Sequence, residues 1–460
     1  MRINNDIIIR YSEKFLPWLN TRISYIIIIL LEFFIFLNLF NNQYNNLYLL
    51  NFSLIIFYSL KILLWIMLSY ILGRYTNKYK ISFLNKNNIK NIIKSIYLIT
   101  LFSIIDILYF SLFNNEIINL ESKINFFKYN LLFLSISIVI NLIKNVIEYK
   151  FLRTKKKWIL LSEDNNIKKE IDIFNNLEQK ISFYNYNSIK NLEISKYKGI
   201  ILIDNLNPNL LKKELINMIK NKDIKTLSIQ KSYYKFMQRI PIQIINDQLG
   251  YDIKSNYLTD KKNYNLFLKR IFEFVFSLLL LLISSPLLII ASILIYLEDK
   301  GPILYSQYRV GKNNKLFTIW KLRSMRVNAE KDGIKWASKN DKRITKIGKL
   351  LRKTRIDELP QLLSVLQGKM NLIGPRPERP EFVELLNEEI KYYSLRALSK
   401  PGITGWAQVN YPYGASINDS KNKLSYDLYY LKHYSLLFDL LIFFKTIRLV
   451  INARGSEPNN

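Results

Sequence analysis

Residues 267–297 read FLKRIFEFVFSLLLLLISSPLLIIASILIYL, an apolar run that Ser284, Ser285 and Pro286 interrupt. Proline removes one helical hydrogen bond and its ring pushes on the preceding turn, so we expect a sharp kink near Ser285. A straight helix of this length would cross a bilayer, whereas a broken one would enter and return as a re-entrant hairpin. The serine hydroxyls can bond the carbonyls that the proline frees within the apolar layer. Charges flank both ends of the run and do not choose between these two forms.

Four further apolar stretches occupy the first third of the chain, and each reaches the roughly 20 residues that cross a bilayer core. They are residues 23–40, 47–72, 92–113 and 126–147. The loop 73–91 carries five Lys and Arg residues with no acid, and residues 150–157 carry another five. The two remaining loops carry little positive charge, so the positive-inside rule places both ends of the bundle in the cytoplasm. Residues 1–150 are therefore predicted to form a four-helix transmembrane domain, with four buried helices of a soluble protein as the alternative.

Composition narrows the chemistry that the chain can perform. The 460 residues carry a net charge of +31, and 49% of them are hydrophobic. Basic charge beside apolar runs indicates an anionic membrane surface and anionic substrates. Nucleic acid is not expected, because the basic and aromatic residues form no known binding module. Cysteine is absent and His433 is the single histidine, so catalysis must rest on carboxylates, Lys, Arg, Tyr or a metal held by carboxylates.

Residues 151–262 show a different pattern, in which short β-like runs alternate with polar helical stretches. The runs are Trp158–Ser162, Ile181–Tyr186, Gly199–Asp204 and Thr226–Gln230. Such alternation predicts a small parallel sheet with helices between its strands, a Rossmann-like α/β module. The first strand leads into LSED at 161–164 instead of a glycine-rich phosphate turn. Nucleotide binding is therefore unsupported in this module, and a structural or regulatory role is favoured.

Residues 354–368 read TRIDELPQLLSVLQG and place two adjacent carboxylates, Asp357 and Glu358, at or just before a helix N-terminus. Pro360 fits the first turn of that helix and Gly368 is a suitable stop. The positive end of the helix dipole favours ionised carboxylates and any phosphate beside them. An ionised Asp357 can attack phosphorus without a general base, and the pair can hold Mg²⁺, which prefers oxygen ligands. For this segment alone, an acidic helix cap worth about 1 kcal/mol is the favoured interpretation.

Cations lie on both sides of this pair in the sequence. They are Lys321, Arg323, Arg326, Lys342, Arg343, Arg352 and Arg355. Residues 371–380, NLIGPRPERP, add Arg376 and Arg379 on a loop that three prolines stiffen. Guanidinium groups on a rigid backbone can clamp a diphosphate through paired hydrogen bonds. A solvated basic face is the alternative, although three prolines around two arginines are unusual on a surface without a ligand.

Together these features resemble the bacterial sugar transferase family, the monotopic phosphoglycosyl transferases, over residues 264–451. The resemblance rests on the order and spacing of several motifs and on the Ser-Pro break in the apolar run. The motifs are GPILYSQ at 301–307, RVG at 309–311, WKLRSM at 320–325, RIDELPQ at 355–361, GPRP at 374–377 and PGITGW at 401–406. The whole layout, with four spanning helices, an α/β module and a catalytic domain at 263–460, resembles the long members that start exopolysaccharide, capsule or O-antigen synthesis.

The resemblance implies an activity and roles for individual residues. In such enzymes the Asp of the Asp-Glu pair attacks the β-phosphate of a UDP-sugar and releases UMP. The phosphosugar then passes to polyprenyl phosphate, usually undecaprenyl phosphate. Asp357 would be the nucleophile, and Glu358 would assist the acceptor phosphate or a magnesium site. The other expected substrate contacts are Lys321, Arg323 and Arg355 at phosphates, Pro375, Arg376 and Pro377 beside the nucleotide, and Arg379.

The implied reaction needs a cytosolic nucleotide and therefore favours the re-entrant form of the apolar run, with Ser285 and Pro286 at its break. The catalytic domain is then expected at the cytoplasmic face of the bacterial inner membrane, where the lipid phosphate lies. A homodimer through the membrane bundle or the middle module is a further expectation. Tyr411 stands where the family more often has Gly, which weakens a sugar contact there, and His433 is expected to pack. The alternative function is a catalytically degenerate membrane scaffold or regulator of a polysaccharide assembly complex.

Overall fold

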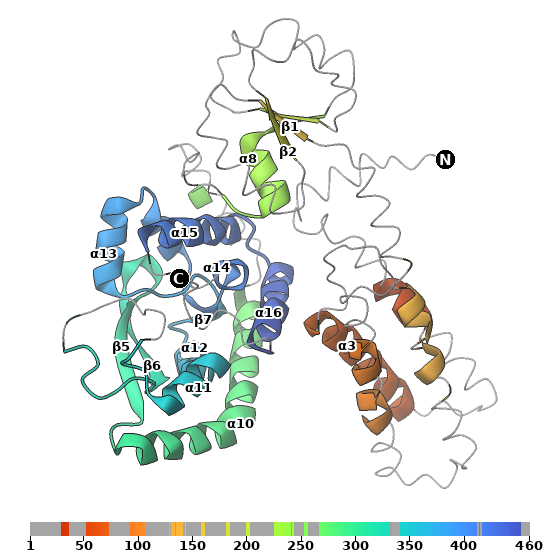
Figure 1. Cartoon of the computed structure of the whole chain (residues 1–460), viewed down its shortest axis with the longest axis horizontal. Helices are drawn as coiled ribbons and strands as arrows, with labels where there is room; N and C mark the ends of the chain where they lie inside the picture. Colours follow the sequence, from red (N-terminus) through yellow and green to blue (C-terminus); the bar gives the residue numbers. More distant parts are fainter. Residues whose placement is uncertain are drawn as a thin grey trace, which may run out of the picture. The chain divides into compact units, whose positions relative to one another are not determined.

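The computed structural model describes many short segments of the first 265 residues and nearly all of the chain after them. The described residues are 29–35, 52–72, 93–98, 100–105, 128, 130–133, 135–140, 143, 158–161, 181–184, 199–202, 225–240, 242, 253–255, 266–331, 333, 341–411, 414 and 416–451. The chain divides into two compact units, one of residues 1–157 and 196–198, and the other of residues 158–195 and 199–460 (Figure 1).

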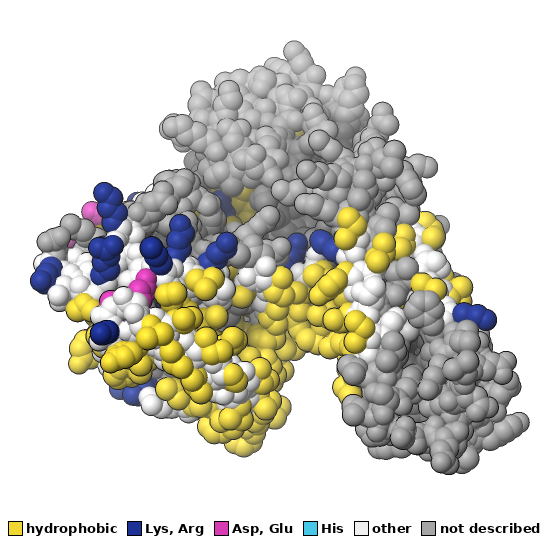
Figure 2. All heavy atoms as spheres, turned by 60° about the horizontal axis from the view of Figure 1, so that its bottom comes forward, with side chains coloured by type: hydrophobic (Ala, Val, Ile, Leu, Met, Phe, Trp, Pro, Cys, Tyr) yellow, Lys and Arg dark blue, Asp and Glu magenta, His cyan; other side chains and the backbone are white. Residues whose placement is uncertain are grey.

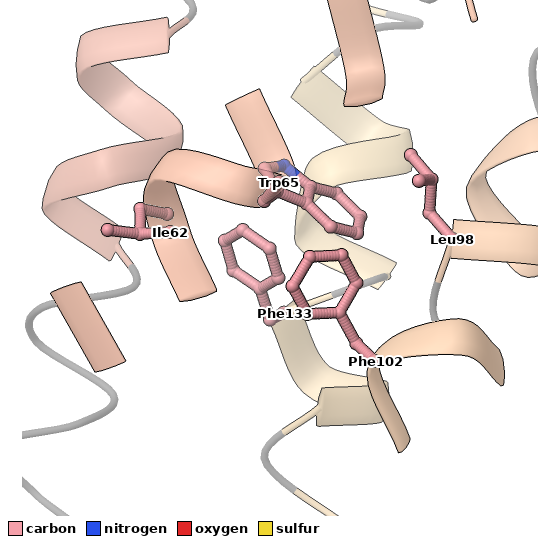
Figure 3. Packing of buried hydrophobic residues seen from close by; sticks show 5 residues of the cluster. All are labelled: Ile62, Trp65, Leu98, Phe102 and Phe133. Atoms are coloured by element: carbon pink, nitrogen blue, oxygen red, sulfur yellow. The ribbon is translucent and has the colours of Figure 1, made fainter. Parts of the chain in front are cut away.

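Helical residues lie inside each of the four N-terminal apolar stretches. They are residues 29–35, α3 (Phe52–Ile71), residues 93–98 with 100–105, and residues 130–133 with 135–140. Trp65 of α3 is buried and makes edge-to-face contacts with Phe102 and Phe133, whose ring centroids lie 5.6 and 4.9 Å away (Figure 3). Ile62 and Leu98 belong to the same buried cluster. The described parts of these stretches thus include apolar helices that pack on one another, while the four-helix transmembrane bundle remains a prediction.

The four predicted strands of the middle module are present, although Ile229 and Gln230, predicted as the end of the fourth strand, are helical. The strands are β1 (Trp158–Leu161), β2 (Ile181–Tyr184), β3 (Gly199–Leu202) and β4 (Lys225–Ser228), and they form one parallel sheet in the order β2-β1-β3-β4. The apolar strands β1 and β3 take the two central positions, where both faces of a parallel sheet are covered. The connections between the first four strands lie outside the described residues, so the Rossmann-like arrangement of helices remains a prediction. After β4 the chain forms α8 (Ile229–Ser232) and the π-helix η6 (Tyr233–Met237).

The predicted apolar segment forms one helix, α10 (Leu266–Asp299), with Pro286 inside it. Pro286 has no N–H to donate to the carbonyl of Leu282, four residues earlier. The hydroxyl of Ser285 donates to that carbonyl instead, at 2.8 Å. Figure 1 shows the two halves of α10 running in different directions. The expected bend and its hydroxyl partner are present, but the helix bends there without being interrupted, because the serine replaces the bond that proline cannot make.

Both ends of α10 are fastened to the same compact unit. Near the first end, Arg270 donates to the backbone carbonyls of Val365 and Leu366, each at 2.6 Å. At the other end, the carboxylate of Glu298 accepts the backbone N–H of Lys346 at 2.8 Å. A straight helix of 34 residues would hold its ends about 50 Å apart. The bend therefore returns the chain to the domain from which the helix starts.

The surface of α10 is mostly hydrophobic. Its side chains that are more than half exposed include Phe267, Leu282, Ile283, Ile289 and Leu297. Within the described residues, α10 is the one helix that is long and apolar enough to cross a membrane by length and composition. Figure 2 shows hydrophobic side chains gathered on one face, with Lys and Arg side chains beside them. Such a surface is typical of a protein attached to a membrane, whereas the multi-pass location remains a prediction.

The remaining elements build the domain around the predicted Asp-Glu pair. Strands β5 (Leu304–Val310) and β6 (Leu316–Leu322) form an antiparallel hairpin, and the short strands β7 (Asn371–Ile373) and β8 (Gly402–Thr404) pair in parallel. The helices described after α10 are η8 (Lys312–Asn314), α11 (Lys346–Thr354), η9 (Ile356–Gln361), α12 (Leu362–Leu366), α13 (Pro380–Glu389), η10 (Tyr393–Leu398), α14 (Trp406–Asn410), α15 (Ile417–Lys432) and α16 (Leu436–Ile451).

Trp406 lies at the centre of the aromatic core of this domain. Its buried ring packs on Phe438 of α16, with centroids 4.8 Å apart, and on Tyr429 of α15 at 6.3 Å. Its indole N–H donates to the backbone carbonyl of Gln238 at 2.8 Å. A buried indole needs such a partner, and here the segment that follows η6 supplies it. The middle module is thereby joined to α14 and α15.

Gly348 provides a stability test of the packing of α11. A Cβ atom added there would lie 2.0 Å from the backbone oxygen of Ser324. Alanine usually stabilises a helix interior by about 1 kcal/mol relative to glycine. Gly348→Ala is instead expected to lower the free energy of unfolding by about 1–3 kcal/mol, because the helix must move away from Ser324. Urea unfolding in detergent measures the change, with the exposed Lys353→Ala on the same helix as control, and a stabilised Gly348→Ala variant would contradict the packing.

Candidate active site

The Asp-Glu pair lies in a 3₁₀-helix, η9, which leads directly into the α-helix α12. Arg355 ends α11 in the left-handed conformation, with φ of 61°, and the chain then forms η9, which contains Asp357, Glu358 and Pro360. The expected position of both carboxylates at a helix N-terminus is confirmed, and the left-handed turn at Arg355 starts the helical segment at Ile356. Both carboxylates lie in the first turn of that segment, and both are buried, at 7% and 8% exposure.

Glu358 is surrounded by cations. Its Oε1 atom accepts from Nη2 of Arg376 at 2.7 Å and lies 3.5 Å from Nζ of Lys321, while its Oε2 lies 3.4 Å from Nη1 of Arg355. Burial favours the neutral carboxyl, but Arg376, Lys321 and Arg355 together hold the pKa of Glu358 well below its ordinary value. Glu358 is therefore ionised at neutral pH and fixes three cations beside its neighbour.

Asp357 has the opposite character. Its Oδ1 atom is buried and has no hydrogen-bond partner among the described residues. Burial, and then the negative charge of Glu358, raise the pKa of Asp357 above its ordinary value, while Lys321, Arg352 and Arg355 oppose the shift. A buried acceptor without a partner is rare in folded proteins and is expected where a ligand or ion completes the site. The buried Oδ1 of Asp357 is thus available to a ligand, whereas the role of Asp357 as nucleophile remains a prediction.

A cavity of about 430 Å³ lies beside Asp357. Its wall includes eleven cationic side chains and four acidic ones, so the cavity favours a polyanion. The cations are Arg309, Lys321, Arg323, Arg326, Arg343, Arg352, Arg355, Arg376, Arg379, Arg396 and Lys423, and the acids are Glu330, Asp357, Glu378 and Asp427. The hairpin contributes through alternation, because Tyr305, Gln307 and Arg309 share one face of β5 and line the cavity.

The structure brings most of the predicted site residues together. Of the predicted site residues, those that line the cavity are Asp357, Lys321, Arg323, Arg355, Arg376 and Arg379. Glu358 contacts three of them, Lys321, Arg355 and Arg376. Pro375 and Pro377 line a smaller neighbouring cavity instead, so their predicted contact with a nucleotide remains a prediction. Arg323 forms an ion pair with Asp299. Arg379 forms one with Glu330 at 2.7 Å, and so lies in the wall as part of a pair.

Several cavity residues were not predicted. Arg396, Lys423 and Asp427 come from η10 and α15, far from the Asp-Glu pair in the sequence. Their only sequence signal is the placing of Lys423 and Asp427 four residues apart, on one face of a helix. Tyr411 had been considered as a border of the sugar pocket; it lines the cavity, and its hydroxyl donates to Asp419 at 2.9 Å. His433 packs on the ring of Tyr429, with centroids 4.4 Å apart, which agrees with the packing role expected for it.

Magnesium fits this site in part. The described residues contain no group of three or more His, Cys, Asp and Glu side chains that would hold a metal ion without further ligands. The partnerless Oδ1 of Asp357 is a suitable oxygen ligand, whereas both oxygens of Glu358 face cations. Mg²⁺ in phosphate-transferring enzymes is commonly held by one or two carboxylates, substrate phosphates and water. The site is therefore compatible with a magnesium ion that arrives with a phosphate ligand.

Taken together, the fold and the site define a membrane-attached protein with a cation-lined cavity and a buried carboxylate at its wall. Residues 264–453 match the family described as bacterial sugar transferase. The exopolysaccharide production protein PSS of Rhizobium leguminosarum bv. phaseoli is 40% identical over 189 residues, which are 40% of this chain and 94% of that protein. The chain belongs to the bacterial sugar transferase family.

Two longer relatives carry more specific names. A UDP-N-acetylgalactosamine-undecaprenyl-phosphate N-acetylgalactosaminephosphotransferase of Aeromonas hydrophila is 45% identical over 191 residues, 42% of this chain and 45% of the relative. A UDP-glucose:undecaprenyl-phosphate glucose-1-phosphate transferase of Escherichia coli (strain K12) is 35% identical over 227 residues, 49% of this chain and 47% of the relative. The match thus spans about half the length of these two proteins.

Proposed function

We propose that the protein transfers a sugar 1-phosphate from a UDP-sugar to a polyprenyl phosphate, undecaprenyl phosphate in bacteria, and thereby initiates a polysaccharide. The observation that carries the proposal is the buried Oδ1 atom of Asp357, which has no hydrogen-bond partner among the described residues and lies beside the cation-lined cavity. The names of the relatives from Aeromonas hydrophila and Escherichia coli, each for a sugar phosphotransferase acting on undecaprenyl phosphate, support it. The intact pair of Asp357 and Glu358 argues against a degenerate scaffold.

In the first step, a carboxylate oxygen of Asp357 attacks the β-phosphorus of the UDP-sugar. A bond forms between that oxygen and phosphorus, and the bond from phosphorus to the bridging oxygen breaks. UMP leaves with the electron pair, and the sugar phosphate stays on Asp357 as an acyl phosphate ester. Arg376, Lys321 and Arg355 lie around Glu358 at the adjacent position, where they neutralise the charge that builds up on the phosphate oxygens.

In the second step, an oxygen of polyprenyl phosphate attacks the same phosphorus. The bond between phosphorus and Asp357 breaks, the carboxylate is restored, and polyprenyl diphosphate sugar leaves. Glu358 acts by holding Arg376, Lys321 and Arg355 in place for both steps. When Mg²⁺ is bound, Asp357 would hold it with the substrate phosphates, with Glu358 nearby, and the ion would add positive charge at the diphosphate.

The same proposal includes the location of the site. Because both ends of α10 are bonded to one domain, the helix enters the membrane and returns to the same side, with its bend at Ser285 and Pro286. UDP-sugars are made in the cytosol, so this side is the cytoplasmic face of the inner membrane. The apolar surface of α10 then holds the cavity near the level of the lipid phosphate, where the acceptor is presented.

UMP release from a panel of UDP-sugars tests the function, in membranes supplied with undecaprenyl phosphate and Mg²⁺. Release with one sugar, together with a new lipid-linked product and its loss on adding EDTA, is expected. Membranes without the protein provide the control. Absence of release with every sugar, from protein shown to be folded, would contradict the transferase and favour the scaffold.

The pH dependence of this activity has a predictable sign. Asp357 acts as the carboxylate, so activity falls as the pH drops through its pKa. Glu358→Gln removes a negative charge that raises the pKa of Asp357, and the acidic limb of kcat/KM is expected to move to lower pH. Lys321→Met removes a positive charge that lowers this pKa, and the limb is expected to move to higher pH. Shifts of the acidic limb in the same direction for both variants would show that this limb does not report the pKa of Asp357.

A further inference from the structure

The loop that carries Arg376 has an unusual set of hydrogen bonds. Four consecutive backbone carbonyls, from Pro375 to Glu378, each accept a hydrogen bond from a distant segment. The donors are Gly402 N to Pro375 at 2.9 Å, Nη2 of Arg396 to Arg376 at 2.8 Å, Nη1 of Arg309 to Pro377 at 3.2 Å, and Val310 N to Glu378 at 3.0 Å. Two of the four residues are prolines with φ already fixed. Every carbonyl of the loop is therefore hydrogen-bonded, and guanidinium groups donate to the carbonyls of Arg376 and Pro377.

Arg396 lines the cavity, but its hydrogen bonds are made to this loop and to neighbouring side chains. Besides its bond to the Arg376 carbonyl, its Nη1 atom donates to the hydroxyl of Tyr393 at 2.6 Å. Its Nη2 atom also lies 3.0 Å from the carboxylate of Asp427, which is 2% exposed. A buried guanidinium without a counter-charge would be costly, and Asp427 of α15 supplies that charge. The Nη atoms of Arg396 thus contact the loop backbone, Tyr393 and Asp427. Because these contacts occupy them, Arg396 is poorly placed to bind a phosphate.

The fixed position of the Pro375–Glu378 loop determines where Arg376 meets the pair of Asp357 and Glu358. Arg376 extends from it to Oε1 of Glu358 at 2.7 Å, and Glu358 is the direct neighbour of Asp357. A line of contacts therefore runs from Asp427 through Arg396 and the backbone of Arg376 to the carboxylate pair. A side chain on a loose loop would lose this geometry, because small errors in position are costly in phosphoryl transfer.

We propose that Arg396, neutralised by Asp427 and assisted by Arg309, is a positioning residue that holds the Pro375–Glu378 loop so that Arg376 stays on Glu358. The proposal rests on the proposed function only for its kinetic readout. It sets Arg396 and Arg309, which act through the loop backbone, apart from the other arginines of the cavity.

A double-mutant cycle between Arg396→Gln and Arg376→Gln tests the proposal. Arg396→Gln alone is expected to lower kcat for UMP release about 10-fold or more, within the range of coupled pairs. The KM for the UDP-sugar is expected to change by less than about 3-fold, because ground-state binding is retained. In the Arg376→Gln background, Arg396→Gln is expected to have an effect of less than about 2-fold, since the residue it positions is already gone. Multiplicative effects with a raised KM would make Arg396 a phosphate ligand and overturn the proposal.

Two further variants complete this experiment. Arg343→Gln is the matched control, because Arg343 lines the same cavity but its guanidinium pairs with Asp341 at 2.6 Å and, among the described residues, donates to no carbonyl of this loop. Its effect is expected to multiply with that of Arg376→Gln. Arg396 and Arg309, which donate to the loop carbonyls, are called the clamp. Arg309→Gln is the second test of the clamp if Arg396→Gln does not fold. Its effect is likewise expected to be small in the Arg376→Gln background.

Hydrogen–deuterium exchange gives a readout that does not depend on activity. Arg396→Gln and Arg309→Gln are expected to raise exchange in peptides that cover residues 374–379, without raising it in α11. Arg343→Gln is expected to leave both regions unchanged. Unchanged exchange at 374–379 in both clamp variants would overturn the proposal even in an active enzyme. Faster exchange in an enzyme that releases no UMP would support the clamp while the proposed function failed.

Discussion

Replacing Asp357 by Asn is expected to lower UMP release by at least about 10³-fold, because the amide cannot form the bond to phosphorus on which the reaction depends. The fold is expected to survive. Burial raises the pKa of Asp357 above its ordinary value, so the ionised side chain destabilises the native state at any pH above that pKa. Asn keeps the shape and removes this cost. Initial rates and urea unfolding, measured on the same preparation, separate the two effects.

Asp341→Asn serves as the control for this variant. Asp341 is ionised and paired with Arg343 at 2.6 Å, but it does not line the cavity. Its replacement tests whether loss of any aspartate near these arginines lowers the rate. A rate for Asp357→Asn within about 10-fold of the wild-type rate would show that Asp357 does not take part in the chemical step.

Arg376→Gln is the second large expected effect, a loss of about 10²-fold in kcat/KM. Arg376 makes the shortest contact with Glu358, and its charge lies beside the phosphorus in the proposed reaction. Arg379→Gln, three residues along the same loop, is expected to cost about 10-fold or less, because Arg379 is already paired with Glu330 at 2.7 Å. Steady-state kinetics with the preferred UDP-sugar measure both.

The comparison of these two arginines is internally controlled, since both carry the same charge on the same proline-rich loop. An equal loss for the two variants would show that the cavity acts through its total positive charge. A larger loss for Arg379→Gln would mean that the diphosphate lies at the Glu330 side of the cavity, away from Glu358.

The sequence predicted the parts of this protein that depend on local physics. The apolar run with Ser285 and Pro286 gave the bent helix, because proline and hydroxyl chemistry act within one turn. The four strands of the middle module followed from short apolar runs. Asp357, Lys321 and Arg376 were found as cavity residues because they lie in dense, unusual motifs. The reaction itself came from the resemblance of those motifs to a known family.

The parts that sequence reasoning missed depend on tertiary contacts. The difference in character between Asp357 and Glu358 arises from three cations around one carboxylate, two of which, Lys321 and Arg376, come from distant segments. The start of the helical segment at Ile356 depends on the left-handed Arg355, and a positive φ at arginine has no clear sequence signal. Asp427 and Arg396 meet across the domain, and neither lies in a motif that had been singled out. The homodimer remains a prediction.

The covalent intermediate on Asp357 is the central claim, and intact-mass spectrometry tests it most directly. Purified protein in detergent is mixed with its UDP-sugar and Mg²⁺ in the absence of polyprenyl phosphate. We predict a mass increase of one sugar phosphate per chain, one equivalent of UMP, and a modified peptide that maps to Asp357. Adding undecaprenyl phosphate is then expected to discharge the adduct, and Asp357→Asn is expected to show none. UMP that appears only when the lipid is present, with no adduct at any time, would mean direct transfer between the two substrates and would contradict this account.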